Sequence, residues 1–253
     1  MYISRETQGE QVHIPVVVSA SGITDVVYND FYVEEGANVI IVAGCGIHND
    51  GCNDSRHDGI HAFHVGKNAN VTYAEKHYGE GEGTGEKILN PVTQIYLEEG
   101  AVFTLDTAQI GGVDSTVRKT EVYMEADSKL YVMEKLMTHD SQTAVSDMTV
   151  EMNGAGSSAQ IVSRSVAKGN SVQTFHPIAI GNALCHAHVQ CDSIIMDKAQ
   201  ISSIPEINAR DIDAQIIHEA AIGRINNEQI LKLRTFGMTE EEAEAVIIED
   251  FLA

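Results

Sequence analysis

Short segments with apolar residues at alternate positions recur along most of the chain, each introduced by one or two small or turn-forming residues. Alternation with period two points successive side chains to opposite faces of a strand, so each segment predicts one short β-strand. The copies lie roughly thirty residues apart at first and about half that distance apart later. They are EEGANVIIVAG from Glu34, GKNANVTYAEK from Gly66, EEGAVFTLDT from Glu98, EADSKLYVMEK from Glu125, GAGSSAQIVSR from Gly154, KGNSVQTFHP from Lys168, and shorter copies near Ala199 and Ala214.

Strands at regular spacing without helical periodicity between them are typical of a sandwich, a barrel or a β-helix. The slow repeat, with Gly, Asn, Asp or Ala at equivalent corners, favours a stacked solenoid in which Val, Ile, Ala and Met form the inner ladder. An antiparallel sandwich is the alternative. The sequence therefore predicts a mainly β protein, built as a solenoid over residues 1–222.

Two regions interrupt the repeat. Residues 44–64 are polar and rich in turn-forming residues, and residues 77–87, HYGEGEGTGEK, combine glycine with acids. The second region lacks the Gly-Lys-Ser/Thr ending of a nucleotide-binding loop, so we interpret it as a solvated hairpin.

From Asn226 the pattern changes to helical periodicity. Asn226 is an expected N-cap and Gly237 an expected stop, and Thr239 followed by Glu242 predicts the capping of a second helix. The apolar face of that helix consists of Ala243, Val246, Ile247 and Phe251. Residues 223–253 are thus predicted to be a helical segment, which fits either a cap over the open end of the solenoid or a docking platform.

Composition narrows the class of protein. The chain has 253 residues, 43% of them hydrophobic, enough for a sizeable core, and a formal charge of −21. Such an acidic chain is a poor ligand for nucleic acid or for an anionic membrane, and better suited to a basic partner or a metal cation. No apolar run is long enough to span a membrane, so we expect a soluble, cytoplasmic protein.

Four cysteines in two pairs are too few for a secreted disulfide scaffold. The first pair lies in a group of six potential metal donors within residues 45–64, and the asparagines and aspartates between them would equally support a hydrogen-bonded turn. The six are Cys45, His48, Cys52, His57, His61 and His64. Zinc or iron bound by Cys45, Cys52, His48 and His57 is one reading, and plain buried thiols are the other.

The second pair lies in a C-terminal group: Cys185, His186, His188, Cys191, His218 and Glu219. Strand alternation places His186 and His188 on one face and Cys191 on the other. On successive coils, Cys191 and His218 come within reach of one metal. The adjacent His218 and Glu219 project to opposite faces of an extended strand, so they share a site only at a bend or an interface.

Two enzyme classes find little support. HEAAIG has no second histidine one helical turn later, unlike the zinc protease motif. A carbohydrate-active β-helix enzyme stays open as an alternative, although no carboxylate pair stands out and the chain contains no Trp to stack on sugars.

The segment from Gln190 to Leu252, with QCDSIIMD and IIHEAAIG, closely resembles the C-terminal block of the SufB/SufD family of iron–sulfur cluster assembly scaffolds. HAFHVGKNANVTYAEKHYGEG resembles an earlier β segment of the same family, so the resemblance spans most of the chain. It implies a right-handed parallel β-helix followed by C-terminal helices. It also implies pairing of subunits through the β-helix and binding of an ABC-type ATPase, SufC, through the C-terminal region.

By this resemblance, Cys191 corresponds to the cysteine on which a nascent cluster is built, Glu219 to its carboxylate partner, and His218 to a histidine at the subunit interface. Finding all three in one chain suggests a SufB-type subunit that forms a homodimer and holds a transient iron–sulfur cluster. A thiolate accepts sulfur as a persulfide and holds iron, whereas carboxylate and imidazole are weaker ligands that permit release.

The resemblance further implies a scaffold rather than an enzyme, with ATP hydrolysis in the partner ATPase, sulfur from a cysteine desulfurase and apo-proteins as acceptors. The chain looks like a minimal version of the family, because larger members carry an N-terminal helical extension. The Cys45–His64 donors do not transfer from those members. A β-helix protein with a structural zinc and no assembly role is therefore the alternative function.

Overall fold

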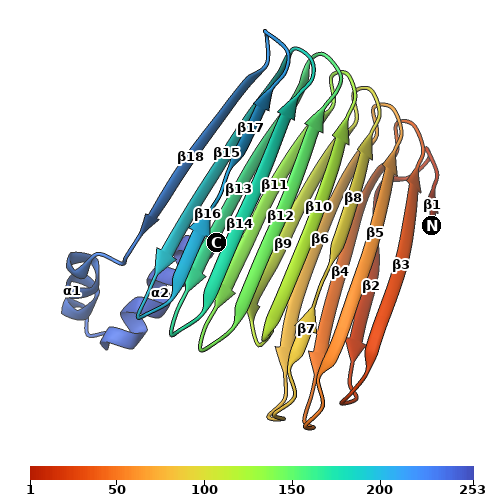
Figure 1. Cartoon of the computed structure of the whole chain (residues 1–253). Coiled ribbons are helices and arrows are strands. Elements are labelled where there is room, and N and C mark those ends of the chain that lie inside the picture. Colours follow the sequence, from red (N-terminus) through yellow and green to blue (C-terminus); the bar gives the residue numbers. More distant parts are fainter.

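The computed structural model describes residues 1–253 and consists of two parallel β-sheets that face each other, followed by two short helices (Figure 1). The chain winds as a β-solenoid of about eight turns, and each turn contributes strands to both sheets. Every strand pair is parallel, which confirms the predicted β-helix and excludes the antiparallel sandwich.

Sheet A contains β1 (Tyr2–Ile3), β3 (Thr24–Val33), β5 (Ser55–Val65), β7 (Lys87–Leu89), β8 (Val92–Leu97), β10 (Ser115–Met124), β12 (Thr143–Met152), β14 (Val172–Gly181), β16 (Gln200–Ser203) and β17 (Glu206–Ala209). Sheet B contains β2 (Gln8–Val18), β4 (Asn38–His48), β6 (Asn70–Glu80), β9 (Val102–Gly111), β11 (Lys129–Thr138), β13 (Ser157–Ala167), β15 (Cys185–Ile195) and β18 (Gln215–Gly223). The helices are α1 (Asn227–Thr235) and α2 (Glu240–Leu252).

The spacing of the sequence repeat follows from this winding. The copies that begin at Glu34, Gly66, Glu98, Glu125 and Gly154 all lead into strands of sheet B, one per coil. The copies at Lys168 and Ala199 lead into sheet A, which halves the apparent spacing. One coil takes 32 residues between Asn38 and Asn70.

Alternating residues from both sheets form one apolar core between them. The main core cluster contains 32 buried residues, including the predicted inner series Val39, Ile41 and Ala43. Aromatic rings also stack from coil to coil, as in the pair Phe31 and Phe63, whose ring centroids are 4.7 Å apart. Burial of this continuous ladder, rather than of any single coil, stabilises the stack.

The two interruptions predicted from sequence are shorter in the structure. β4 continues to His48 and β5 begins at Ser55, so only residues 49–54 form a loop where residues 44–64 were expected to break the pattern. Residues 77–80 belong to β6, and the remaining residues 81–86 link sheet B to sheet A. The expected hairpin is therefore wrong, because the flanking strands β6 and β7 lie in different sheets.

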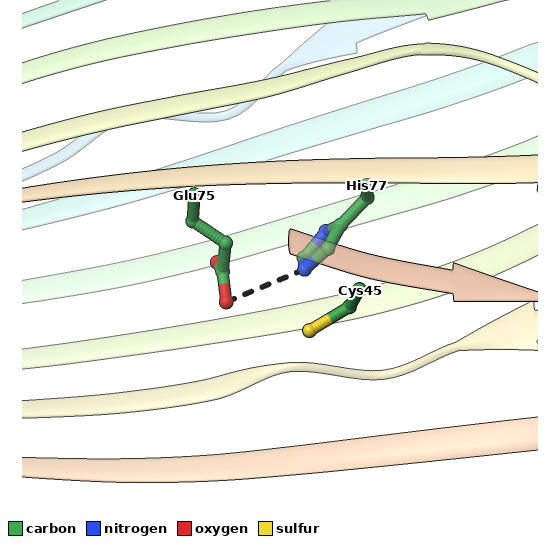
Figure 2. A group of neighbouring side chains, drawn as sticks. All are labelled: Cys45, Glu75 and His77. Carbon is green, nitrogen blue, oxygen red and sulfur yellow. Dashed lines mark ion pairs between the residues drawn. The ribbon is translucent and has the colours of Figure 1, made fainter. Parts of the chain in front are cut away.

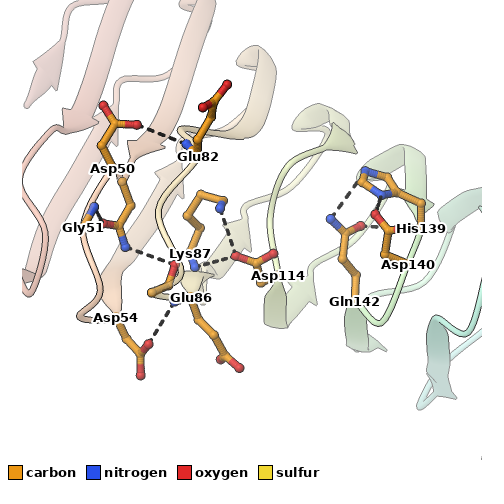
Figure 3. A network of polar contacts seen from close by, with 12 residues as sticks. Asp50, Gly51, Asp54, Glu82, Glu86, Lys87, Asp114, His139, Asp140 and Gln142 are labelled. Atoms are coloured by element: carbon orange, nitrogen blue, oxygen red, sulfur yellow. Dashed lines mark hydrogen bonds and ion pairs between the residues drawn. The ribbon is translucent and has the colours of Figure 1, made fainter.

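Acidic side chains fix these corners to one another (Figure 3). The backbone N–H of Glu82 donates to Asp50 at 3.1 Å, and that of Glu86 donates to Asp54 at 2.9 Å. Lys87 donates to Asp114 through its backbone at 2.8 Å, and its Nζ lies 3.2 Å from the same carboxylate. Each contact joins one coil to the next, so the glycine-rich corner is held without strand pairing.

The outer face of sheet A carries a second aromatic ladder. Four ring contacts, with centroids 5.0, 4.7, 5.0 and 5.2 Å apart, link Tyr2, Tyr32, His64, Tyr96 and Tyr123. All four are near-parallel stacks. His64 therefore serves as one ring of this ladder and points away from the core.

The helical segment is capped as the sequence predicts. The Asn226 side chain accepts from the backbone N–H of Glu228, and Thr239 and Glu242 form a reciprocal capping box. α1 buries no side chain. None of the helices is long and apolar enough to cross a membrane.

α2 packs beside the last residues of the sheet B strands rather than across the open end of the solenoid. Its Leu252 is buried against Val166 and Met196, and Ile194 of β15 packs against the same small cluster. Arg164 donates to the carbonyl of Phe251 at 3.2 Å. The final coil is thus left uncovered by the helices.

Candidate functional site

The final coil forms an open end of the solenoid. β18 pairs with β15 on one side only, and the opposing strands β16 and β17 are short. Apolar side chains are exposed here instead of buried: Ile204, Ile207, Ile212, Ile217 and Ile222. Unpaired backbone groups and exposed apolar side chains together are typical of a surface that another chain covers.

Cys191 and His218 meet at this end, just inside the solenoid. Cys191 lies on β15 and His218 on β18, and the register places Val189 opposite His218 and Cys191 opposite Ala220. Both side chains face the space between the sheets, and Cys191 Sγ lies 3.3 Å from His218 Nε2. Cys191 is buried, whereas His218 is half-buried. The prediction that these two residues approach each other on successive coils is confirmed.

The environment keeps both groups neutral near pH 7. Burial raises the pKa of the Cys191 thiol to about 11, with further contributions from Glu134 and Asp192, against the opposing hydrogen bond from Ser203. Burial also lowers the pKa of His218, and nearby His188 lowers it further. A neutral imidazole leaves a ring nitrogen free to bind a metal, whereas Cys191 must lose its thiol proton when it binds a cation.

A cavity of about 10 Å³, room for roughly one water molecule, adjoins the Cys191 side chain inside the stack. Its lining includes the hydroxyl groups of Ser146, Ser163, Ser165, Ser193 and Ser203. Two of these, Ser146 and Ser163, donate to the buried carboxylate of Glu134 at 2.8 and 3.1 Å. The interior beneath Cys191 is therefore polar rather than apolar.

Glu219 points to the other side of β18. It pairs in register with Gln190, and its carboxylate lies 3.5 Å from His188 Nε2 on the outer face of sheet B. Its side chain is 65% exposed. The opposite orientation of His218 and Glu219, expected for an extended strand, is thus confirmed. Within one chain, Glu219 does not join the Cys191–His218 pair.

The N-terminal donors are distributed over three environments. His48 binds Asp50 at 2.8 Å on the surface, and Cys52 is exposed in the following loop. His57 is buried and lies 2.8 Å from Asp25. Of the four predicted ligands Cys45, His48, Cys52 and His57, only Cys45 joins a compact donor group, and its two companions, Glu75 and His77, come from β6 rather than from the loop (Figure 2).

Sequence reasoning missed Glu75 and His77 because His77 was assigned to the glycine-rich corner. The repeat itself carried the signal: in a parallel stack, residues one coil apart are neighbours. Cys45 lies opposite His77 in the register of β4 and β6, and Glu75 lies two residues earlier on the same face. Adding the length of one coil to residue number 45 gives 77, so this count would have identified His77 as the neighbour of Cys45.

Residues 19–251 match the family described as SUF system FeS cluster assembly, SufBD core domain. This match covers far more than half of the chain, and the parallel solenoid with C-terminal helices agrees with the expected fold. The chain therefore belongs to the SufBD core domain family of iron–sulfur cluster assembly proteins.

Curated relatives carry the same family name. An iron–sulfur cluster assembly SufBD family protein of Methanocaldococcus jannaschii is 26% identical, over 95% of this chain and 76% of the relative. One from Archaeoglobus fulgidus is 28% identical, over 99% of this chain and 68% of the relative. One from Methanothermobacter thermautotrophicus is 27% identical, over 89% and 55%. These relatives extend beyond the matched region.

Proposed function

We propose that this chain is a cytoplasmic scaffold subunit of a SUF-type complex, on which a nascent iron–sulfur cluster is built and then handed to apo-proteins. The observation that carries the proposal is the 3.3 Å approach of Cys191 Sγ and His218 Nε2 at the uncovered end of the solenoid. A thiolate holds iron and sulfur firmly, and an imidazole holds iron less firmly. Such a pair suits a cluster that must later leave.

The neutral state of the pair supports controlled loading. The neutral thiol of Cys191 and the neutral imidazole of His218 share one hydrogen bond between Sγ and Nε2. Binding of iron displaces the thiol proton. Transfer of sulfur from a persulfide on a cysteine desulfurase instead forms a new S–S bond on Cys191 as the S–S bond of the donor breaks, and the donor cysteine leaves as a thiol that takes up the proton. In this proposal the Cys191 thiol stays protonated, and therefore a weak nucleophile, until iron or the sulfur donor arrives.

A homodimer through the open end would complete the site. The outer edge of β18 is free to pair, and its exposed Ile217 and Ile222 provide apolar area for a second copy. Glu219 is 65% exposed and points away from Cys191 of its own chain, so in the proposed dimer it would serve a site shared with the second copy. Replacement of Ile222 by Asp is expected to yield monomers in light scattering, whereas Val117→Asp, at a similarly exposed position of sheet A, leaves the dimer intact.

The C-terminal helices are the proposed docking surface for a SufC-like ABC ATPase, which supplies ATP hydrolysis. Leu231 of α1 and Phe236 after it are exposed, and α1 makes no buried contact with the solenoid. α2 packs against Ile194, three residues beyond Cys191 on β15. Movement of the helices by the ATPase would therefore act directly on the strand that carries Cys191.

The cluster site is tested by anaerobic reconstitution with iron and sulfide. Cys191→Ala is expected to retain far less iron and sulfide than the unchanged protein, and His218→Ala to retain an intermediate amount. Cys52→Ala, which removes an exposed cysteine in a surface loop, is the matched control. Equal cluster retention by Cys191→Ala would exclude Cys191 as the ligand, and a colourless zinc protein after anaerobic purification would favour a structural zinc function.

The docking surface is tested by co-purification with the ATPase. Leu231→Ser combined with Phe236→Ser is expected to abolish binding. Leu184→Ser removes an equally exposed leucine from the turn between β14 and β15, at the opposite end of the strands, and should leave binding unchanged. Undiminished binding by the double variant would place the ATPase elsewhere.

A further inference from the structure

The group around Cys45 lies well away from the Cys191–His218 pair and has no role in the function proposed above. Cys45 is on β4, and Glu75 and His77 are on β6, whereas Cys191 and His218 are separated from them by β9, β11 and β13. One donor atom from each of the three side chains lies within 4.8 Å of the others, and all three residues are buried (Figure 2). We propose that Cys45, Glu75 and His77 bind one divalent transition-metal ion, of the zinc or ferrous class, inside the solenoid.

The donor set and its spacing fit such an ion. Thiolate, imidazole and carboxylate are the ligands of tetrahedral zinc sites and of many ferrous sites. His77 Nε2 lies 3.3 Å from Glu75 Oε1, which is about the nitrogen–oxygen edge of a tetrahedron with bonds of about 2.0–2.1 Å. Cys45 Sγ lies within 4.8 Å of a donor atom of each of these two side chains, and we infer that the Cys45 side chain turns toward the ion on binding.

A fourth donor points into the same space from the facing sheet. His61 of β5 is buried, and its Nε2 has no hydrogen-bond partner and lies 4.0 Å from Glu75 Oε1. Gly59, two residues earlier on the same inward face, leaves room for this ring, since a Cβ there would lie 2.9 Å from His61 Nε2. An unsatisfied buried nitrogen is costly, and a metal ion would satisfy it.

The charge of the surrounding interior also favours a cation. Two carboxylates, those of Glu75 and Glu134, and one guanidinium, that of Arg118, are buried in this part of the interior. We call these three groups the charged seam. Glu75 Oε1 lies 3.3 Å from His77 Nε2 and accepts from the Tyr73 hydroxyl at 2.9 Å, and both contacts suit a carboxylate. A divalent ion that displaces the Cys45 proton adds one net positive charge and balances the seam.

The contact between Arg118 and His77 shows what must move. Arg118 can only donate, so His77 Nδ1 accepts from its guanidinium at 3.2 Å and Nε2 carries the proton that faces Glu75. On binding, this proton passes to Nδ1 and Arg118 turns fully toward Glu134, whose carboxylate is already 3.8 Å away. Gln109, opposite His77 in register, has a buried amide oxygen without a partner that can accept the Nδ1 proton.

A line of polar side chains leads from the surface to this site. Asp25 is 37% exposed and contacts Nδ1 of buried His57. Gly59 leaves a gap where another residue would have its Cβ, and both His57 and His61 border this gap. A Cβ there would lie 3.5 Å from His57 Nε2 and 2.9 Å from His61 Nε2. Buried histidines therefore connect the exposed carboxylate to Glu75.

Titration with Co²⁺ tests the proposal independently of cluster assembly. In Cys191→Ala protein, which lacks the thiolate of the other site, we expect one bound Co²⁺ per chain with a thiolate-to-cobalt absorption band, displaced by Zn²⁺ in competition. Adding Cys45→Ala should abolish the band and the stoichiometric binding. Adding Cys52→Ala instead, at the exposed cysteine, should change neither.

Two further variants guard against a result caused by misfolding. Glu75→Gln keeps the shape of the side chain and should weaken Co²⁺ binding at least tenfold, with an unchanged β-sheet circular dichroism spectrum. Asp25→Asn should slow Co²⁺ uptake and leave the final stoichiometry at one. A Co²⁺ spectrum without the thiolate band, or one that survives Cys45→Ala, would overturn the proposal. Such a failure leaves the Cys191 reconstitution result unaffected, so the two functions are judged separately.

Discussion

Cys45 and Cys191 both point inward from sheet B, two register positions apart, and are buried to the same extent, at 2% and 3% exposure. Burial raises both thiol pKa values, to about 12 and about 11. Their histidine partners differ: His77 is enclosed by later coils, whereas His218 belongs to the last strand of its sheet. A solenoid thus brings a cysteine and a histidine of successive coils together in two registers, directly opposite at Cys45 and two residues offset at Cys191, and we expect position in the stack to decide whether a bound species stays or leaves.

The largest expected difference between the two regions is in charge compensation. Arg118→Ala removes the only cation among the buried carboxylates near Cys45, and we expect a loss of about 3–5 kcal/mol in unfolding free energy. Denaturant unfolding followed by circular dichroism measures it. Lys119→Ala is the control, since Lys119 points outward beside Glu121 and its loss should cost about 1 kcal/mol or less. Equal effects would show that the seam is not held by Arg118.

The second prediction concerns pH. With Cys45 replaced by Ala, affinity of Fe²⁺ or Zn²⁺ for the Cys191–His218 pair should rise about tenfold per pH unit from pH 7 to pH 9, because one thiol proton leaves on binding. The raised pKa of Cys191 keeps that proton on throughout this range, and the lowered pKa of His218 means the imidazole releases none. Calorimetry in buffers of different ionisation enthalpy counts the protons. Release of two protons would contradict the neutral His218.

The smallest expected effect is on packing. Cys45→Ala should cost about 1 kcal/mol, since coils on both sides of β4 prevent collapse around the lost sulfur. Cys191→Ala should cost about half as much, because Cys191 already borders a cavity and the single-sided β18 can shift. Comparison of the two denaturation midpoints under metal-free conditions measures this. A larger loss for Cys191→Ala would indicate that the open end is packed as tightly as the middle.

Much of the fold was predictable because the alternation of apolar residues and their recurrence about every thirty residues can be read directly from the chain. The inner series at Val39, Ile41 and Ala43 and the capped helices after Asn226 and Thr239 were found in this way. Most strands of sheet A were not, since their inner faces mix polar and apolar residues. β5, for example, turns His57 and His61 inward, and no pattern of hydrophobicity marks it as a strand.

The two candidate sites differ in the same way: one could be predicted from local patterns of the sequence, and the other could not. The approach of Cys191 and His218 and the outward direction of Glu219 follow from alternation once successive coils are assumed. The cluster of Cys45 with Glu75 and His77 needs the register, which depends on the number of residues in each corner. Hydrogen bonds such as that from the Glu82 backbone N–H to Asp50 determine which residues lie in a corner and which in a strand. These bonds form only in the folded stack.

The aromatic ladder on sheet A has an optical consequence. All eight tyrosines lie between Tyr2 and Tyr131, and the chain has no tryptophan. Tyrosine fluorescence and the tyrosine bands of the near-ultraviolet circular dichroism spectrum therefore report only on the strands from β1 to β11, which include the Cys45 cluster. The coils that carry Cys191 are silent at these wavelengths. If the tyrosine signal is lost before the far-ultraviolet β-sheet signal, the N-terminal half of the solenoid unfolds before the C-terminal half.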